Sequence, residues 1–267
     1  MTKHVELQPL LDIMARLRDP ENGCPWDIKQ TYQSIVPFTI EEAYEVADAI
    51  ERSDYDDLKG ELGDLLFQVV FYAQIAQEEQ RFEFQDIVDG ICHKLTQRHP
   101  HVFSDQQFDN EGELHRAWEL QKHKERQHKN QNASLMDDIP NSLPGIKRAQ
   151  KLQKRAAKQG FDWPSVDGVW DKVDEEIAEL KQALAADENS PEKNAAVMEE
   201  FGDLMFALVN LSRHLNLDAE QALRLANRKF EARFRSVEQA VKESGKTVAD
   251  TSLEKLELFW QQAKQAE

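Results

Sequence analysis

Two stretches of the chain gather carboxylates at helical spacing. The first reads EEAYEVADAIERSDYDDLKGELGD and contains two pairs, Glu42 with Glu45 and Glu61 with Asp64. Residues three apart on an α-helix lie on one face, so each pair presents two carboxylates in the same direction. Between the pairs, residues 52–56 carry cap-forming side chains, which predicts a short turn between two antiparallel helices. The sequence therefore predicts four carboxylates that face one another across a helical hairpin.

The same pattern returns in the second half, where Glu176 pairs with Glu179 and Glu200 with Asp203. The connection between the pairs is longer in this copy, 21 residues against 16, while the spacing within each pair is unchanged. An interval of 139 residues between the matched E-x-x-D acids favours duplication of a whole domain over a short solenoid repeat. Other features repeat in the same order: Trp26 and Trp163, Lys94-x-x-x-Arg98 and Lys229-x-x-x-Arg233, Trp118-x-x-x-Lys122 and Trp260-x-x-x-Lys264.

Four carboxylates at one place need compensation. Two like charges about 4 Å apart repel by roughly 4 kcal/mol at a surface-like dielectric constant, so such a cluster persists when some groups are protonated or a cation binds. Ligand sets made only of oxygen select hard cations such as Mg²⁺ or Mn²⁺. A di-iron bundle would place Glu-x-x-His on two helices, and no histidine stands at these positions. The pattern favours Mg²⁺, which commonly completes its shell with waters and substrate phosphates.

The basic residues that follow suit a phosphate chain. Lys94 with Arg98, and Lys229 with Arg233, are four residues apart on downstream helices, where they can neutralise phosphates beside a metal. Two tryptophans, each with a lysine one turn later, can stack on a base or cap the pocket. These are Trp118 with Lys122 and Trp260 with Lys264.

Each feature also has a plainer explanation. A charge run on one helix is usually a solvated face, and only the partner pair and the duplication argue against this for Glu41–Glu45. The basic pairs can be partners in surface salt bridges. Gly63 and Gly202, inside predicted helices, can serve close packing or leave room for a metal-bound water or phosphate. Trp26 and Trp163 can be core residues.

Composition narrows the functional class. With 267 residues and a net charge of −17, the chain is expected to form one large or two small domains and not to bind nucleic-acid backbones. No apolar run is long enough for a signal peptide or a membrane-spanning helix, so no membrane partner is expected. Two cysteines, Cys24 and Cys92, are too few for a disulfide scaffold, which favours a cytoplasmic location.

Apolar residues recur with a period of 3.6 along most of the chain, and strand-like alternation is nearly absent, which predicts an all-α protein. A polar segment with two prolines, residues 129–144, is expected to link two domains, residues 1–128 and 145–267. The expected helices lie near residues 5–18, 28–52, 56–80, 84–97, 111–128, 145–158, 166–186, 192–214, 218–242 and 252–265.

Taken together, these motifs resemble the MazG family. The arrangement EE-x-x-E followed by E-x-x-D, present twice, is similar to the family's signature. The resemblance covers nearly the whole chain in the tandem two-domain form. The other segments that carry it are CPWD at 24–27, KQT at 29–31 and RHPHVF at 98–103 in the first half, and GFDW at 160–163 and KFEARF at 229–234 in the second.

The resemblance implies an all-α nucleoside triphosphate pyrophosphohydrolase, which uses Mg²⁺ to cleave nucleoside triphosphates to monophosphates and pyrophosphate and serves clean-up of the nucleotide pool. It implies two tandem helical domains with four-helix-bundle sites formed through dimerisation. Its metal-binding carboxylates map onto Glu42, Glu45, Glu61, Asp64, Glu176, Glu179, Glu200 and Asp203. Its nucleotide-contacting positions in the second half map onto Lys172 to Glu176, Ala196 to Glu199, Lys229 to Arg233, Trp260 and Lys264.

The expected mechanism is metal-assisted hydrolysis, with a carboxylate as general base for the attacking water. Glu175 or Glu176 is the candidate base in the second copy, and Glu41 or Glu42 in the first. The second copy is slightly preferred as the catalytic one. An alternative is a regulatory or scaffolding module that binds Mg²⁺-nucleotide at one or both sites without turnover, and a third possibility is a purely structural helical dimer.

Overall fold

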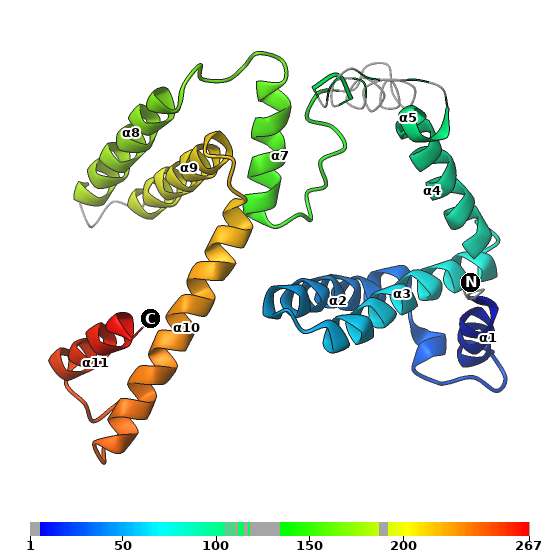
Figure 1. Cartoon of the computed structure of the whole chain (residues 1–267), viewed down its shortest axis with the longest axis horizontal. Coiled ribbons are helices and arrows are strands. Elements are labelled where there is room, and N and C mark those ends of the chain that lie inside the picture. Colours follow the sequence, from blue (N-terminus) through cyan, green and yellow to red (C-terminus); the bar gives the residue numbers. More distant parts are fainter. Residues whose placement is uncertain are drawn as a thin grey trace. The chain divides into compact units, whose positions relative to one another are not determined.

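The structure is a computed structural model that describes residues 6–104, 106, 108, 110, 112–114, 117, 134–186 and 192–266. Within these residues all regular elements are helices and there is no strand (Figure 1), so the predicted all-α class is confirmed. The chain divides into two compact units, Met1–Glu125 and Arg126–Glu267. No helix in the described part of the chain has the length and apolar character needed to cross a membrane.

The N-terminal unit is built around a hairpin of two long helices, α2 and α3, with α1 packed against α3. Its core contains Met14, Ile35, Val70, Phe71 and Ile75, all at most 4% exposed. The elements are α1 (Gln8–Leu17), a 3₁₀ turn (Asp27–Lys29), α2 (Tyr32–Arg52), α3 (Tyr55–Glu78), α4 (Phe84–Arg98) and α5 (Pro100–Phe103).

The turn between α2 and α3 takes only two residues. Ser53 adopts a left-handed conformation (φ 58°) that ends α2, and the side chain of Asp54 accepts a hydrogen bond from the backbone N–H of Asp57 and so caps α3. Arg52 clamps this turn through ion pairs with Asp48 (2.7 Å), Asp54 (3.2 Å) and Asp57. The short turn brings the two acidic pairs to a similar height on neighbouring helices.

The C-terminal unit repeats the hairpin with α8 and α9, and α7 packs against α9. Lys147 near the start of α7 pairs with Asp218, the N-cap of α10. From there α10 leads away from the hairpin and packs against α11 (Figure 1). The helices are α7 (Gly145–Ala157), α8 (Val166–Ala185), α9 (Lys193–His214), α10 (Ala219–Glu243) and α11 (Leu253–Gln265).

Most observed helices lie within a few residues of those expected from periodicity, but residues 28–52 divide into the 3₁₀ turn and α2, and the short helix α5 was not expected. Most of the expected helix near 111–128, with Trp118 and Lys122, lies outside the described residues, as does the first part of the expected linker. Residues 187–191, in the longer connection between the acidic pairs of the second copy, lie outside them too. In the described part of that connection, α9 follows Glu192, which makes no side-chain cap bond.

Candidate active site

Each helical hairpin brings carboxylates from both of its helices to one place. In the N-terminal unit, ligand atoms of Glu42 and Glu45 on α2 and Glu61 on α3 lie within 4.8 Å of one another. In the C-terminal unit, Glu176 on α8 forms an equally tight group with Glu200 and Asp203 on α9. The spacing of the acidic pairs predicts four carboxylates in each copy, and three of the four form each group.

The fourth predicted carboxylate of each copy lies just outside its group. Burial, followed by the charges of Glu45 and Asp64, raises the pKa of Glu42. Burial, followed by the charge of Glu179, likewise raises the pKa of Glu200. Asp64 and Glu179 are therefore close enough to affect the pKa values of the carboxylates in the two groups. The oxygens that lie within 4.8 Å of one another nevertheless belong to the other three carboxylates of each copy.

Glu176 is the most buried of the three carboxylates in the C-terminal group. Its side chain is 6% exposed, and its Oε1 lies 2.7 Å from Nζ of Lys172. Its Oε2 is buried and has no hydrogen-bond partner among the described residues. A buried carboxylate oxygen without a partner costs free energy, because its hydration is lost and nothing replaces it. The donor set, three carboxylates with one orphaned oxygen, fits a hard divalent cation.

Lys172 links this group to the second candidate base. Its ammonium group lies 2.9 Å from Oε1 of Glu175, an exposed carboxylate one position before Glu176. Hydrogen bonds to Glu176 and Glu175 raise the pKa of Lys172, so it stays charged. Phe38 occupies the matched position in the N-terminal unit, three residues before Glu41, as Lys172 stands three residues before Glu175. The centroid of its ring lies 5.9 Å from that of the Trp26 ring, in an edge-on arrangement. The two acidic groups therefore differ in their nearest neighbours.

A cavity of about 410 Å³ adjoins the C-terminal acidic group. It lies among α7, α8, α9 and the loop between α7 and α8. Lys172, Glu176 and Asp203 form part of its wall, so the cavity and the carboxylates share one site. Most of the remaining wall is apolar, with Leu152, Ala156, Phe161, Trp163, Val169 and Phe206 among its members.

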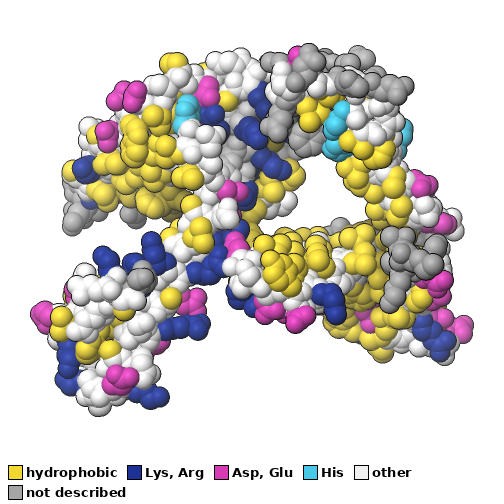
Figure 2. All heavy atoms as spheres, viewed as in Figure 1, with side chains coloured by type: hydrophobic (Ala, Val, Ile, Leu, Met, Phe, Trp, Pro, Cys, Tyr) yellow, Lys and Arg dark blue, Asp and Glu magenta, His cyan; other side chains and the backbone are white. Residues whose placement is uncertain are grey.

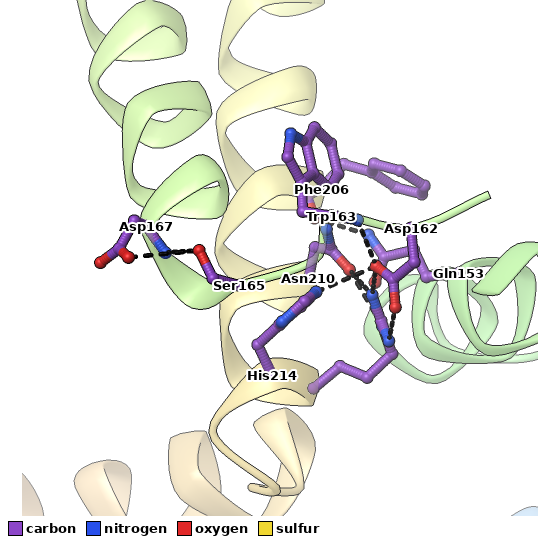
Figure 3. A network of polar contacts seen from close by, with 9 residues as sticks. Gln153, Asp162, Trp163, Ser165, Asp167, Phe206, Asn210 and His214 are labelled. Atoms are coloured by element: carbon purple, nitrogen blue, oxygen red, sulfur yellow. Dashed lines mark hydrogen bonds and ion pairs between the residues drawn. The ribbon is translucent and has the colours of Figure 1, made fainter. Parts of the chain in front are cut away.

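A polar network fixes the loop that closes this cavity (Figure 3). Asp162 accepts hydrogen bonds from Arg213 (2.8 Å) and forms a contact with Nε2 of His214 (2.9 Å), both near the end of α9. Arg213 also donates to Oδ1 of Asn210 at 3.0 Å. The guanidinium of Arg213 holds the pKa of Asp162 at about 2. The loop is thereby tied to α9 by a charged, directional contact.

The N-terminal unit fills the corresponding position with an aromatic side chain. Phe71 stands seven residues after Asp64, as Asn210 stands seven residues after Asp203. Phe71 is completely buried, and the guanidinium of Arg18 lies over its ring at 5.4 Å. A core phenylalanine thus replaces the polar cavity-lining asparagine, which makes the two copies chemically unequal.

The structure argues against close packing at the two helical glycines and against a core position for the two tryptophans. A Cβ built on Gly63 or Gly202 would meet no described atom within 4 Å, so neither glycine serves close packing within the described chain. Trp26 and Trp163 are 52% and 40% exposed, so neither is a core residue.

Comparison with known proteins decides the family. The chain is 54% identical over 266 residues to the "Nucleoside triphosphate pyrophosphohydrolase" of Escherichia coli K12, covering 98% of each chain. The chain belongs to the MazG family. The family model, the MazG nucleotide pyrophosphohydrolase domain, matches residues 30–103. The "Nucleoside triphosphate pyrophosphohydrolase/pyrophosphatase MazG" of Thermotoga maritima is 42% identical over 257 residues, 96% of this chain and 95% of that one.

The remaining candidates of this MazG-family chain stand on α4, α10 and α11 or directly beside glutamates of the two acidic groups. Trp260 on α11 contacts Phe230 at 5.2 Å and lies 5.8 Å from the guanidinium of Arg233 on α10. None of the four candidates on α10 and α11 lines the cavity. On the N-terminal side, Lys94 is exposed and Arg98 half-buried on α4, and Glu41 is exposed on α2. Glu199, on α9 of the C-terminal unit, is also exposed. The four on α10 and α11 are Lys229, Arg233, Trp260 and Lys264.

Sequence reasoning did not identify the cavity. Gln153, Asn210, Arg213 and His214 were not singled out, and Asp162 entered only as a letter of the GFDW motif. The contacts that tie the loop to α9 join residues more than 50 positions apart, as with Asp162 and Arg213. The available signal was the occurrence of Asn210 where the first copy has a phenylalanine.

Proposed function

We propose that this chain hydrolyses nucleoside triphosphates to monophosphates and pyrophosphate with Mg²⁺, or Mn²⁺, as cofactor. The observation that carries the proposal is the group of Glu176, Glu200 and Asp203, with one buried oxygen left unpaired beside a ligand-sized cavity. The printed names of the relatives in Escherichia coli and Thermotoga maritima support the same reaction. ATP and other nucleoside triphosphates are the proposed ligands.

When bound, the metal supplies neutralisation of phosphate charge and activation of a water. Glu175 or Glu176 accepts the proton of the attacking water, whose oxygen bonds to the α-phosphorus as the bond to pyrophosphate breaks. Lys172 holds both carboxylates and places a permanent positive charge beside the phosphates. In the N-terminal unit, Glu41 or Glu42 is the equivalent base.

The proposal includes Lys229, Arg233, Trp260 and Lys264 as phosphate and nucleotide contacts of the C-terminal site, together with Glu199. In the N-terminal site the same roles fall to Lys94, Arg98, Trp118 and Lys122. Since the described α10 and α11 lie away from the acidic group, these contacts require a movement of the helices or a second chain.

A homodimer is part of the proposal. Met198, Phe201, Met205 and Leu208 form one stripe along α9 and are between 44% and 73% exposed. Figure 2 shows apolar side chains gathered over the α8–α9 hairpin. A second copy of the same hairpin would cover this stripe and turn two helices into a four-helix bundle, the arrangement in which inward carboxylates hold metals. No nucleic-acid or membrane partner is proposed.

The C-terminal unit is the proposed main catalytic site, because Lys172 and the cavity adjoin its carboxylates. The N-terminal unit, with Phe38 and Phe71 at the matched positions, fits the second candidate function, a site that binds Mg²⁺-nucleotide with little or no turnover. We place the protein in the cytoplasm, in keeping with its two free cysteines, Cys24 and Cys92.

The test uses the full-length chain with the N-terminal group disabled by Glu61→Gln. In this background, Glu176→Gln or Asp203→Asn is expected to lower the rate of monophosphate and pyrophosphate formation by on the order of a hundredfold. Circular dichroism spectra should stay unchanged. Full turnover in either variant refutes the assignment of the site, and nucleotide binding without any product in the parent chain favours the regulatory alternative.

A further inference from the structure

Two segments outside the helices contribute to the wall of the cavity beside the C-terminal acidic group. The linker supplies Met136, which is 39% exposed, and the loop between α7 and α8 supplies Phe161, which is 83% exposed. A side chain that lines a cavity and is also exposed lies where the cavity meets solvent. Both segments therefore reach the rim of the cavity, and the way in which each is held decides which of them can open it.

Residues 134–141, here called the strap, form an ordered turn beside α7 (Figure 1). The backbone N–H of Ser134 donates to Oδ2 of Asp137 at 2.8 Å, and the backbone N–H of Met136 donates to Oγ of Ser134 at 3.2 Å. These bonds lie within the strap and do not depend on the rest of the unit. The strap can therefore keep its own conformation when it moves.

Two arginines of α7 attach the strap to the helix. Nη1 of Arg155 donates to the backbone carbonyl of Leu135 at 2.8 Å and also to that of Asp137. Two turns earlier, Nη2 of Arg148 donates to Oδ1 of Asn141 at 2.9 Å. All three acceptors are neutral oxygens. The strap is thus attached by directional hydrogen bonds without a carboxylate on its side of the contact.

The strap is held less firmly than the loop that carries Phe161. In that loop Asp162 pairs with Arg213, so Coulomb attraction adds to the hydrogen bond. In the strap only Ile139 is buried, and Asp138 beside it has a φ of 62°, in the left-handed region. A segment with exposed hydrogen bonds and little buried apolar surface opens at a lower free energy than its surroundings. The strap is therefore the side that opens, with Ile139 as its anchor.

We propose that the strap is a gate, in which residues 134–138 move about Asp138 to admit and release the ligand of the cavity, and Arg155 holds them closed in between. This inference rests on the proposed function, which it deepens by assigning the control of nucleotide exchange at the C-terminal site. Glu176 and Asp203 share the cavity wall, so a nucleotide held at these carboxylates through a metal lies in the space that the strap closes.

The experiment measures rates of exchange and does not depend on turnover. In the full-length chain with Glu61→Gln, association and dissociation of the fluorescent nucleotide mant-ATP are followed by stopped flow with Ca²⁺ in place of Mg²⁺. Arg155→Met removes both hydrogen bonds to the strap and should raise the two rate constants by on the order of tenfold each. Since these bonds are lost from the free and the bound chain alike, the dissociation constant should change by less than about threefold.

A second variant opens the strap without touching an arginine. Asp138→Val places a β-branched residue at a positive φ, which disfavours the closed strap, and should also raise both rate constants. Asp138→Asn is its matched control, because asparagine tolerates this conformation, and should leave both unchanged. Arg81→Met, at an exposed arginine of the N-terminal unit, is the control for Arg155→Met and should likewise change neither rate.

The outcomes separate this inference from the proposed function. Weaker binding with an unchanged association rate in Arg155→Met, or unchanged rates in both opening variants, overturns the gate even when the parent chain hydrolyses nucleotides. Rates that rise in both variants, in a chain that forms no monophosphate with Mg²⁺, support the gate and overturn the proposed hydrolysis. A parent chain that binds no mant-ATP overturns both.

Discussion

Replacing Asp162 by Asn removes the charge that ties the α7–α8 loop to α9. Asp162 has a pKa of about 2 in the fold against an ordinary value of 3.8, and Arg213 is the main cause. A lowering of the pKa by this amount corresponds to about 2 kcal/mol of stability at neutral pH. The side chain is 24% exposed, so solvent screens this contact only in part. Asp162→Asn is therefore expected to destabilise the C-terminal unit by about 2 kcal/mol at pH 7.

The loss of stability caused by Asp162→Asn should decrease as the pH falls. Because the pKa of Asp162 is lowered on folding, its contribution is complete above pH 3.8 and is lost as the pH falls towards 2. The difference between the parent and Asp162→Asn should therefore shrink to about 1 kcal/mol at pH 3. Scanning calorimetry of the parent chain and Asp162→Asn at pH 7 and pH 3 measures this difference in stability. A loss of about 2 kcal/mol is expected to lower the transition temperature by roughly 5 °C or more.

Glu238→Gln, at an exposed carboxylate of α10, is the matched control and should change little at either pH. A double-mutant cycle with Arg213→Met should assign most of the effect to the pair. An equal loss of stability at pH 7 and pH 3, or a loss no larger than that of Glu238→Gln, would refute the electrostatic account of this contact.

Three further predictions follow from the two hairpins. Burial and neighbouring carboxylates raise the pKa of Glu200, so its charged form is repelled by these neighbours at pH 8. Glu200→Gln should therefore raise the transition temperature in EDTA and remove the stabilisation of the C-terminal unit by Mg²⁺. A lower transition temperature in EDTA would contradict repulsion among these carboxylates. Phe201→Asp should convert the proposed dimer into a monomer in light scattering, with helicity unchanged; a variant that stays dimeric places the interface elsewhere. Asp54→Ala removes the N-cap of α3 and should lower the free energy of unfolding in urea by about 1 kcal/mol. An unchanged free energy of unfolding would show that the cap is dispensable.

The helices and the acidic groups were accessible from the sequence because they depend on local rules. Helix α3, expected over 56–80, runs from Tyr55 to Glu78, and its N-cap is an aspartate of the predicted turn. The i,i+3 pairs lie on one face by helix geometry alone. Two consecutive helices with a two-residue turn can only be antiparallel neighbours, so the meeting of Glu42 and Glu61 followed directly.

The cavity was not accessible in this way because it depends on side chains that meet from distant segments. Gln153 receives its orientation from the backbone of Phe206, 53 residues later, and this contact has no spacing rule. The positions of α10 and α11 were also not predictable, since their motifs suggest candidate phosphate contacts but not where the helices pack. Volume left empty in a core is set by packing, and the two copies differ at one such position, with Phe71 in the first and Asn210 in the second.

Lys172 has a consequence for the heat of metal uptake. In the C-terminal group the ammonium of Lys172 already balances part of the negative charge of the carboxylates. The N-terminal group has Phe38 at the matched position, and the pKa values of its Glu42 and Glu61 are raised. A cation that enters the N-terminal group therefore displaces more protons into the buffer at mildly acidic pH. Titrations in buffers of different ionisation enthalpy can then separate the two sites of one chain by proton release alone.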